Sequence, residues 1–283
     1  MKRGTLSVLI ATGASMALTR VAMADYTNNI LITGYWPQTN NMLRPFSTNS
    51  AQNPDGWVGE NWQGQGWDIH GYFPEFPNGQ TSPGQWGKGE GDFEVDYQDT
   101  NSDWNRIIGE IQPAAIITFS RGRAGSNWEI EGRLRWWSPN QWINDYEGER
   151  KPTTDMAIFD DLTPLEFYDS ALPVDDILQA VADTGAVDSV FIDQAGGGRF
   201  LSEFIGMHGM WNHLMNEGDD SVAQSFAAGH IHVGIDTPLA AAEMATEATL
   251  MALTNHLNEI VPAPGSLLLF AGGLAGLSAR RRR

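Results

Sequence analysis

The sequence predicts an α/β protein: a three-layer sandwich with a mostly parallel central sheet and helices on both faces. Short apolar runs alternate along the chain with segments whose apolar residues recur at helical spacing. The run 114–119 is continuously apolar, which is typical of a parallel strand covered on both faces. In such sheets, ligands sit beyond the carboxyl ends of the strands, so residues that end strands are the first candidates for function.

The elements of the first half are expected as follows. The apolar run 30–34 predicts a first buried strand. Residues 37–92 are rich in Gly, Asn, Gln, Pro and Trp, and we expect long ordered loops with one short helix. Alternating apolar and polar residues predict a strand over 93–97. Residues 101–103 offer N-cap candidates for a helix that ends at Pro113.

The second half continues the alternation. We expect helices over 174–181, 201–215 and 238–257, and strands over 187–192 and 230–233. No dinucleotide or Walker A motif is present, and no Lys-Ser/Thr follows Gly196-Gly197-Gly198, so phosphate binding is a weak hypothesis. We expect His230 and His232 on opposite faces of their strand, which makes them poor joint metal ligands. No metal and no cofactor is expected.

Ten of the eleven tryptophans lie between Trp36 and Trp142, and some belong to a Trp/Gly-rich insertion over about 50–91. One interpretation is a platform for a carbohydrate or aromatic ligand. The other is that large rings hold loops that lack a core of their own. We favour the second.

The N-terminus is typical of a signal peptide over residues 1–24. Lys2 and Arg3 precede an apolar stretch, and Ala22-Met23-Ala24 provides a small-x-small cleavage pattern. An N-terminal anchor helix is the alternative, but the apolar run is shorter than the roughly 20 residues that span a bilayer.

The C-terminus combines three features in order: a Pro-containing motif over 261–265, an apolar run over 266–277 and four arginines, Arg280 to Arg283. This tail, 261–283, resembles the PEP-CTERM sorting signal, with VPAP in place of VPEP. The resemblance implies an exosortase-type partner and an exported protein, periplasmic or at the cell surface, that is at least transiently held in the membrane by its tail. A plain C-terminal membrane anchor is the alternative.

The domain between these ends, 25–260, is strongly acidic. The two ends hold seven basic and no acidic residues, which leaves 10 basic and 35 acidic residues and a net charge of −25. Such a surface repels nucleic acid and anionic lipid, so no nucleic-acid partner is expected. The chain has no cysteine, which excludes disulfides, thiolate metal sites and thiol nucleophiles.

Three segments at strand ends carry polar residues: 120–133, 193–204 and 229–233. They supply, in chain order, a glutamate, a serine at a helix start and a histidine. These residue types can form a nucleophile, a general base and an orienting carboxylate. The backbone N–H groups of a helix start can stabilise an oxyanion.

Five segments resemble, in the same order, motifs of the pyroglutamyl-peptidase I (pyrrolidone-carboxylate peptidase) family. They are ILITGYWP; FEVDYQDT with IQPAAIITFSRGR; WEIEGR; LPVDDILQAV with VFIDQAGGGRFLSEF; and GHIHV. The resemblance implies an α/β peptidase that needs no metal or cofactor and commonly forms oligomers, so a homo-oligomer is one expectation here.

The resemblance also suggests site residues. Ser202 stands where the family has its nucleophilic cysteine, and His232 stands at the catalytic histidine. Glu131 stands at the catalytic glutamate, with Glu129 as the alternative. For substrate binding the candidates are Tyr35 and Trp36, in the loop that supplies aromatic walls around the pyroglutamyl ring, and Gly198, which keeps a glycine of the nucleophile motif.

The chain departs from the family at several points. Serine replaces cysteine, Gly234 replaces the proline after the histidine motif, and the first loop is rebuilt as Pro37-Gln38-Thr39-Asn40. Two functions therefore remain. The first is an exported hydrolase that releases an N-terminal pyroglutamyl-type group by acyl-enzyme chemistry on Ser202. The second is a catalytically inactive, surface-associated protein of the same fold that binds a peptide or saccharide.

Overall fold

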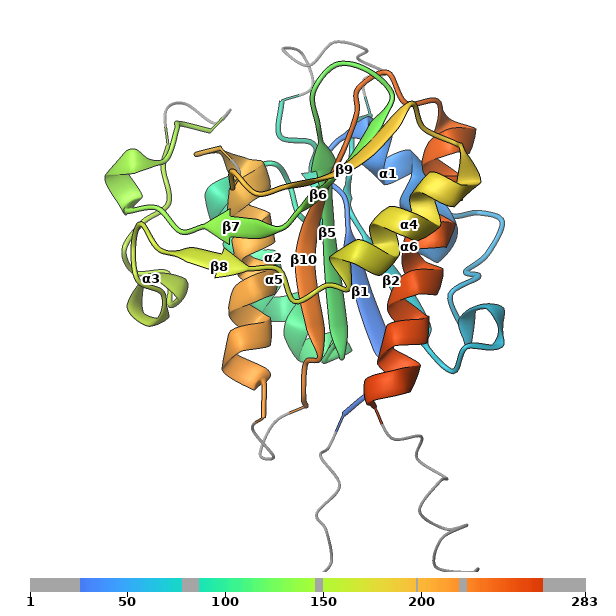
Figure 1. Ribbon diagram of the computed structural model, residues 1–283. Helices are drawn as coiled ribbons and strands as arrows, with labels where there is room; N and C mark the ends of the chain where they lie inside the picture. Colours follow the sequence, from blue (N-terminus) through green and yellow to red (C-terminus); the bar gives the residue numbers. More distant parts are fainter. Residues whose placement is uncertain (1–25, 78–86, 146–149, 197, 219–222, 262–283) are drawn as a thin grey trace, which may run out of the picture.

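The computed structural model describes residues 26–77, 87–145, 150–196, 198–218 and 223–261. Its centre is a six-stranded sheet in the order β2-β1-β5-β10-β6-β9 (Figure 1). The strands are, in that order, β2 (Asp68–Tyr72), β1 (Asn29–Thr33), β5 (Ala115–Arg121), β10 (Ala227–Val233), β6 (Asn127–Glu131) and β9 (Ser189–Asp193). The first four are parallel, β6 is antiparallel to β10, and β9 is parallel to β6. The predicted mostly parallel sheet is confirmed.

Helices cover both faces of this sheet (Figure 1). On one face lie α1 (Pro37–Leu43), α4 (Val174–Thr184) and α6 (Leu239–Ile260), and on the other lie α2 (Tyr97–Ile111) and α5 (Leu201–Asn216). Successive residues of β1 divide between two apolar clusters: Ile30 belongs to the one that contains Ile177 of α4, whereas Leu31 belongs to the one that contains Trp104 of α2 and Phe204 of α5. The predicted three-layer sandwich is therefore confirmed.

Smaller elements decorate the sandwich. A two-stranded ribbon, β7 (Arg133–Arg135) with β8 (Phe167–Asp169), packs against α5. A second pair is β3 (Pro74–Glu75) with β4 (Glu90–Gly91), and α3 (Ile158–Asp161) precedes β8. Single 3₁₀ turns occur at Arg44–Phe46, Trp62–Gly64 and Pro139–Gln141.

The strand expected over 93–97 is wrong, and so is the N-cap expected at 101–103. Phe93 has φ 55°, a left-handed conformation that strands do not contain. Asp96 caps α2, because its carboxylate accepts hydrogen bonds from the backbone N–H groups of Gln98 and Asp99 at 2.8 and 3.0 Å. The apolar residues of the alternating pattern, Phe93, Val95 and Tyr97, are buried beside the helix start, and the capping residue Asp96 is buried as well.

Two sheet strands were not predicted. β6 contains Glu129 and Glu131, which sequence analysis assigned to a loop, because polar residues interrupt its apolar pattern. β2 lies within the region expected to be loops. It is short of large apolar side chains because Gly71 brings it close to the backbone of the α1 segment: a Cβ there would lie 3.1 Å from the Leu43 carbonyl oxygen.

The expectation that His230 and His232 point to opposite faces is also wrong. Their ring centroids are 4.6 Å apart. Residues i and i+2 of a strand share one face, so both histidines lie on the side of the sheet covered by α5.

Buried tryptophans support the interpretation that large rings hold the loops. Trp62 and Trp67 are 3% and 4% exposed and belong to the core on the α6 face. Trp67 Nε1 also donates a hydrogen bond to Asn258 Oδ1 on α6, at 2.8 Å. These contacts attach the irregular segment before β2 to the helical layer.

Two glycines allow α5 to lie directly on the sheet. A Cβ on Gly206 would lie 3.2 Å from Cβ and Cγ of His230, and one on Gly209 would lie 3.3 Å from Ile116 Cγ2. Because Gly206 meets β10 near its carboxyl end and Gly209 meets β5 nearer its start, α5 runs antiparallel to these strands. The first turn of α5 therefore lies at the carboxyl end of the sheet.

We expect Gly206→Ala to lower the free energy of unfolding by up to about 2 kcal/mol. Overpacking against Leu134 Cδ1 and His230, which would lie 3.0 and 3.2 Å from the new Cβ, costs roughly 1–3 kcal/mol, and helix propensity offsets about 1 kcal/mol of this. Gly209→Ala brings the same gain in helix propensity, and its new Cβ would make a looser contact. Its free energy of unfolding should therefore stay within about 1 kcal/mol of that of the parent protein. Urea denaturation of both variants measures this, and equal stabilities would contradict the close contact at Gly206.

Protonation of His208 should make the fold acid-sensitive. Burial of this ring lowers its pKa from 6.5 to about 4, so the unfolded chain binds a proton that the folded chain does not. Stability is then fully present above pH 6.5 and is lost as the pH falls toward 4, by about 2 kcal/mol between pH 7.5 and 5. His208→Gln should remove about that much of the decline in denaturation measured across this range. A variant that keeps the full decline would show that His208 is not its source.

Candidate functional site

A group of polar side chains lies on the α5 face of the sheet, at the carboxyl end of β10. Residues of β5, β10 and β6 contribute to it, all from positions that point to this face. They are Thr118, Ser120, Glu129, Glu131, His230 and His232, and none is fully exposed. The surrounding face is otherwise apolar, so each of these polar groups requires a partner.

Glu131 and His232 form the central pair. Glu131 Oε1 accepts a hydrogen bond from His232 Nδ1 at 2.8 Å, and the glutamate is 1% exposed. Because Nδ1 carries the donated hydrogen, Nε2 is the basic atom of the neutral ring. The second oxygen, Oε2, is buried and has no hydrogen-bond partner among the described residues. The carboxylate is therefore available to fix the tautomer and balance the charge of the histidine.

Ser202 is in the first turn of α5 and is partly exposed. It lies four residues before Gly206, on the same helix face and about 6 Å closer to the helix start. His232 lies two residues beyond His230, about 6.6 Å further along β10. Since Gly206 contacts His230, Ser202 comes to the level of His232. Among the described residues, no hydrogen bond joins Ser202 Oγ to the His232 ring.

Glu129, the alternative carboxylate, has a different environment. Its Oε2 pairs with Arg123 Nε at 3.3 Å. Burial raises the pKa of its carboxyl group, as does a hydrogen bond with Asp193, whereas His232 and Arg123 lower it. Glu129 is thus paired with an arginine, and Glu131 is the carboxylate that is bonded to His232.

Glu129, Glu131 and His232 also form a group that could hold a metal ion, since each offers a ligand atom within 4.8 Å of the others. Sequence spacing did not indicate this group because its members come from two strands that become neighbours only in the folded sheet. The Arg123 pair and the hydrogen bond within the group already balance part of its charge.

Sequence analysis missed a buried serine–histidine pair, Ser120 with His230. It lies on the same face of the sheet as His232, and His230 is two residues before His232 on β10. His230 Nε2 and Ser120 Oγ are 2.8 Å apart, and His230 Nδ1 and Thr118 Oγ1 are 2.7 Å apart. Thr118 donates to the Gly229 carbonyl, so it accepts from Nδ1–H, and Ser120 donates to Nε2. All three residues are fully buried, and burial lowers the pKa of His230 well below its usual value, so the ring is neutral. This network joins β10 to β5 and has no access to a substrate.

Of the three predicted substrate-binding residues, two are buried and one is exposed. Tyr35 is fully buried, its hydroxyl is hydrogen-bonded to Thr100, and burial raises its pKa well above the usual value. Trp36 is 6% exposed and stacks on Phe76, with ring centroids 6.2 Å apart. Gly198 is exposed, and its carbonyl accepts a hydrogen bond from Trp137 Nε1 at 3.2 Å.

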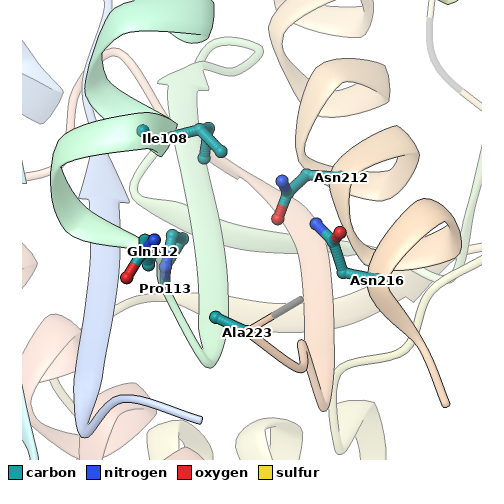
Figure 2. Close-up of a pocket in the computed structure, with 7 residues that line it drawn as sticks. Ile108, Gln112, Pro113, Asn212, Asn216 and Ala223 are labelled. Carbon is teal, nitrogen blue, oxygen red and sulfur yellow. The ribbon is translucent and has the colours of Figure 1, made fainter. Parts of the chain in front are cut away.

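A hollow of about 180 Å³ lies between the end of α2 and α5 (Figure 2). Asn212 and Asn216 of α5 and Gln112 and Pro113 beyond α2 line it. It is at the start of β5, at the opposite end of the sheet from His232, and none of its lining side chains is titratable. It is therefore separate from the candidate site.

Comparison with solved structures supports the fold. Pyrrolidone carboxyl peptidase from Thermococcus litoralis matches with a TM-score of 0.56 and 19% identity, over 82% of this chain and 96% of the other. A mutant pyrrolidone carboxyl peptidase from Pyrococcus furiosus matches with a TM-score of 0.55 and 15% identity, over 81% and 99%. No curated protein matches the sequence.

The C-terminal residues 261–283 match the PEP-CTERM protein-sorting motif, as predicted. Within the described part of the chain, no helix is both long and apolar enough to cross a membrane. The protein thus combines the fold of the pyrrolidone carboxyl peptidases with a C-terminal sorting motif of exported proteins.

Proposed function

We propose that the protein is an exported hydrolase that releases an N-terminal pyroglutamyl-type group through an acyl-enzyme on Ser202. The observation that carries this proposal is the Glu131–His232 hydrogen bond of 2.8 Å at the carboxyl end of β10, where the first turn of α5 presents a serine. The fold shared with pyrrolidone carboxyl peptidases adds support. By the resemblance of the sequence motifs, Ser202, His232 and Glu131 correspond to that family's catalytic residues.

In the proposed reaction, Ser202 Oγ attacks the carbonyl carbon of the amide bond and its proton passes to His232 Nε2. Glu131 accepts Nδ1–H throughout and stabilises the imidazolium. The tetrahedral oxyanion is stabilised by backbone N–H groups at the start of α5, where the helix dipole is also favourable. His232 then gives its proton to the leaving amine, and water, activated by the same histidine, hydrolyses the ester.

The replacement of a thiol by an alcohol requires this arrangement. A cysteine with a pKa near 8.5 is readily converted to a thiolate, whereas a serine hydroxyl must lose its proton during attack. His232, whose Nδ1 is hydrogen-bonded to the buried Glu131 carboxylate, would be the base that accepts this proton. The oxidation chemistry of an exposed thiol is avoided as well.

The place where the described chain ends agrees with attachment of the domain at a membrane surface. Both ends of the described chain leave the fold at the amino ends of the parallel strands (Figure 1), whereas His232 lies at the carboxyl end of β10. Recognition of the tail by an exosortase-type enzyme would hold the domain in the periplasm or at the cell surface, with the site directed away from the point of attachment.

A second function is supported by a specific observation. Tyr35 and Trp36 are buried in the core, so neither ring is free to form a wall of a pyroglutamyl pocket. A catalytically inactive protein of this fold, binding a peptide or saccharide at the surface, would tolerate that loss.

The two functions differ in how the protein reacts with a fluorophosphonate probe. We expect Ser202 to be labelled, Ser202→Ala to abolish labelling, and His232→Ala to slow it by about 10²–10⁴-fold because the general base is lost. Ser120→Ala is the matched control: it removes the buried serine–histidine pair and should leave labelling unchanged. Mass spectrometry of the labelled peptide identifies the modified residue.

Absence of labelling in a folded protein would exclude an activated serine and favour the binding function. If Ser202 is labelled, pyroglutamyl amides are the first substrates to test.

A further inference from the structure

Three arginines and two aromatic rings form a continuous stack on the β7–β8 ribbon and the loop before α5. The Arg133 guanidinium lies 4.2 Å from the Phe167 ring centre, and that of Arg135 lies 4.9 Å from Phe167 and 4.4 Å from Trp137. Arg199 completes the stack at 5.7 Å from Trp137. We call these five residues the arginine stack. Arg199 is exposed and Phe167 is 39% exposed, so the stack faces solvent.

The arginines of the stack are not paired with carboxylates. Five of the seven other basic residues of the domain form ion pairs, namely Arg44, Lys88, Arg106, Arg123 and Arg150, whereas Arg121 and Lys151 do not within the described part of the chain. In the described part of the chain, no carboxylate oxygen lies within 4.0 Å of the Arg133, Arg135 or Arg199 guanidinium. Asp169 is directly opposite Arg133 in the β7–β8 register and still does not pair with it.

Stacking on the aromatic rings explains why these arginines form no ion pair, and it leaves N–H donors available to an anion. A guanidinium that covers an aromatic face keeps its N–H donors in its own plane, directed away from the ring. Arg133 Nε is buried and has no hydrogen-bond partner within the described residues, while Arg135 Nε donates to the Leu165 carbonyl at 3.3 Å, so an anion would be bound by the terminal N–H groups of these side chains. A planar fork held on a ring matches the two oxygens of a carboxylate.

The stack adjoins the candidate site through both segments that build it. Arg133 follows Glu131 by two residues, and Arg199 precedes Ser202 by three. The hydrogen bond from Trp137 Nε1 to the Gly198 carbonyl ties the ribbon to the loop before α5. A chain that extends from a group held at Ser202 and His232 therefore has the stack as neighbouring surface.

We propose that the arginine stack binds acidic side chains of the peptide whose N-terminal group lies at Ser202. This inference rests on the proposed function. Arg133 and Arg135 are i and i+2 on β7, so their side chains emerge on one side of the ribbon about 7 Å apart. An extended peptide repeats its side chains at the same interval, which favours a peptide over a saccharide. The substrate class is thus peptides with Asp or Glu after the first residue.

The test is a binding measurement that does not need turnover. Full-length protein carrying Ser202→Ala is titrated into two fluorescein-labelled peptides, pyroglutamyl-Glu-Gly-Glu and pyroglutamyl-Gln-Gly-Gln, and anisotropy is recorded. We expect the acidic peptide to bind at least tenfold more tightly. Arg133→Gln with Arg135→Gln should remove the difference. Arg44→Gln with Arg106→Gln, which makes the same charge change away from the stack, should preserve it.

Arg135→Lys provides a second variant in which the charge remains and the planar fork is lost, and it should weaken selectivity without unfolding the ribbon. Equal binding of the two peptides, or selectivity that survives the double substitution, would overturn the proposal. So would tighter binding of polyglucuronate that the same substitutions abolish, since the stack would then serve a saccharide. Because Ser202 is already replaced, these outcomes are independent of whether that serine reacts with the fluorophosphonate probe.

Discussion

The direct packing of α5 on β10 is the contact on which the candidate site depends. Gly206 removes the side chain that would otherwise separate the helix from His230. This close approach sets the height of the helix start relative to the strand end, and it closes the buried His230 network from above. A helix one side-chain layer further out would leave the Thr118–His230–Ser120 bonds open to water and would carry Ser202 away from the level of His232.

The buried polar side chains around His230 are stabilised by a chain of hydrogen bonds in which each donor has a fixed acceptor. Each hydrogen of the His230 network has one acceptor: Thr118 donates to a carbonyl, His230 donates to Thr118, and Ser120 donates to His230. A buried neutral network of this kind rigidifies the strands that carry it. His232 is the next residue on the same face of β10, and its own donor is taken by Glu131. The lower histidine thus serves structure and the upper one is available for chemistry.

Much of the fold could be predicted from sequence, because its inner strands are apolar runs and its helices have apolar spacing, with proline marking their limits. The pairing of Glu131 with His232 was expected from the resemblance in motif order, and the structure brings the two side chains together. β6 was not predicted, since Glu129 and Glu131 break the apolar pattern that identifies a buried strand. The Ser120–His230 bond was also missed, because it joins residues 110 positions apart and depends on the register of two parallel strands.

Burial of Glu131 gives the site its electrostatic direction. A carboxylate that is 1% exposed has lost most of its hydration, and a neutral imidazole returns only part of that free energy through one hydrogen bond. A protonated imidazole returns more, because the pair then attracts as opposite charges at low dielectric. Glu131 is therefore placed to stabilise the positive charge that His232 would gain in the proposed attack of Ser202 on a carbonyl. In the proposed reaction Ser202 needs this assistance, and the carboxylate that would supply it lies on β6, a strand that the apolar pattern of the sequence does not mark.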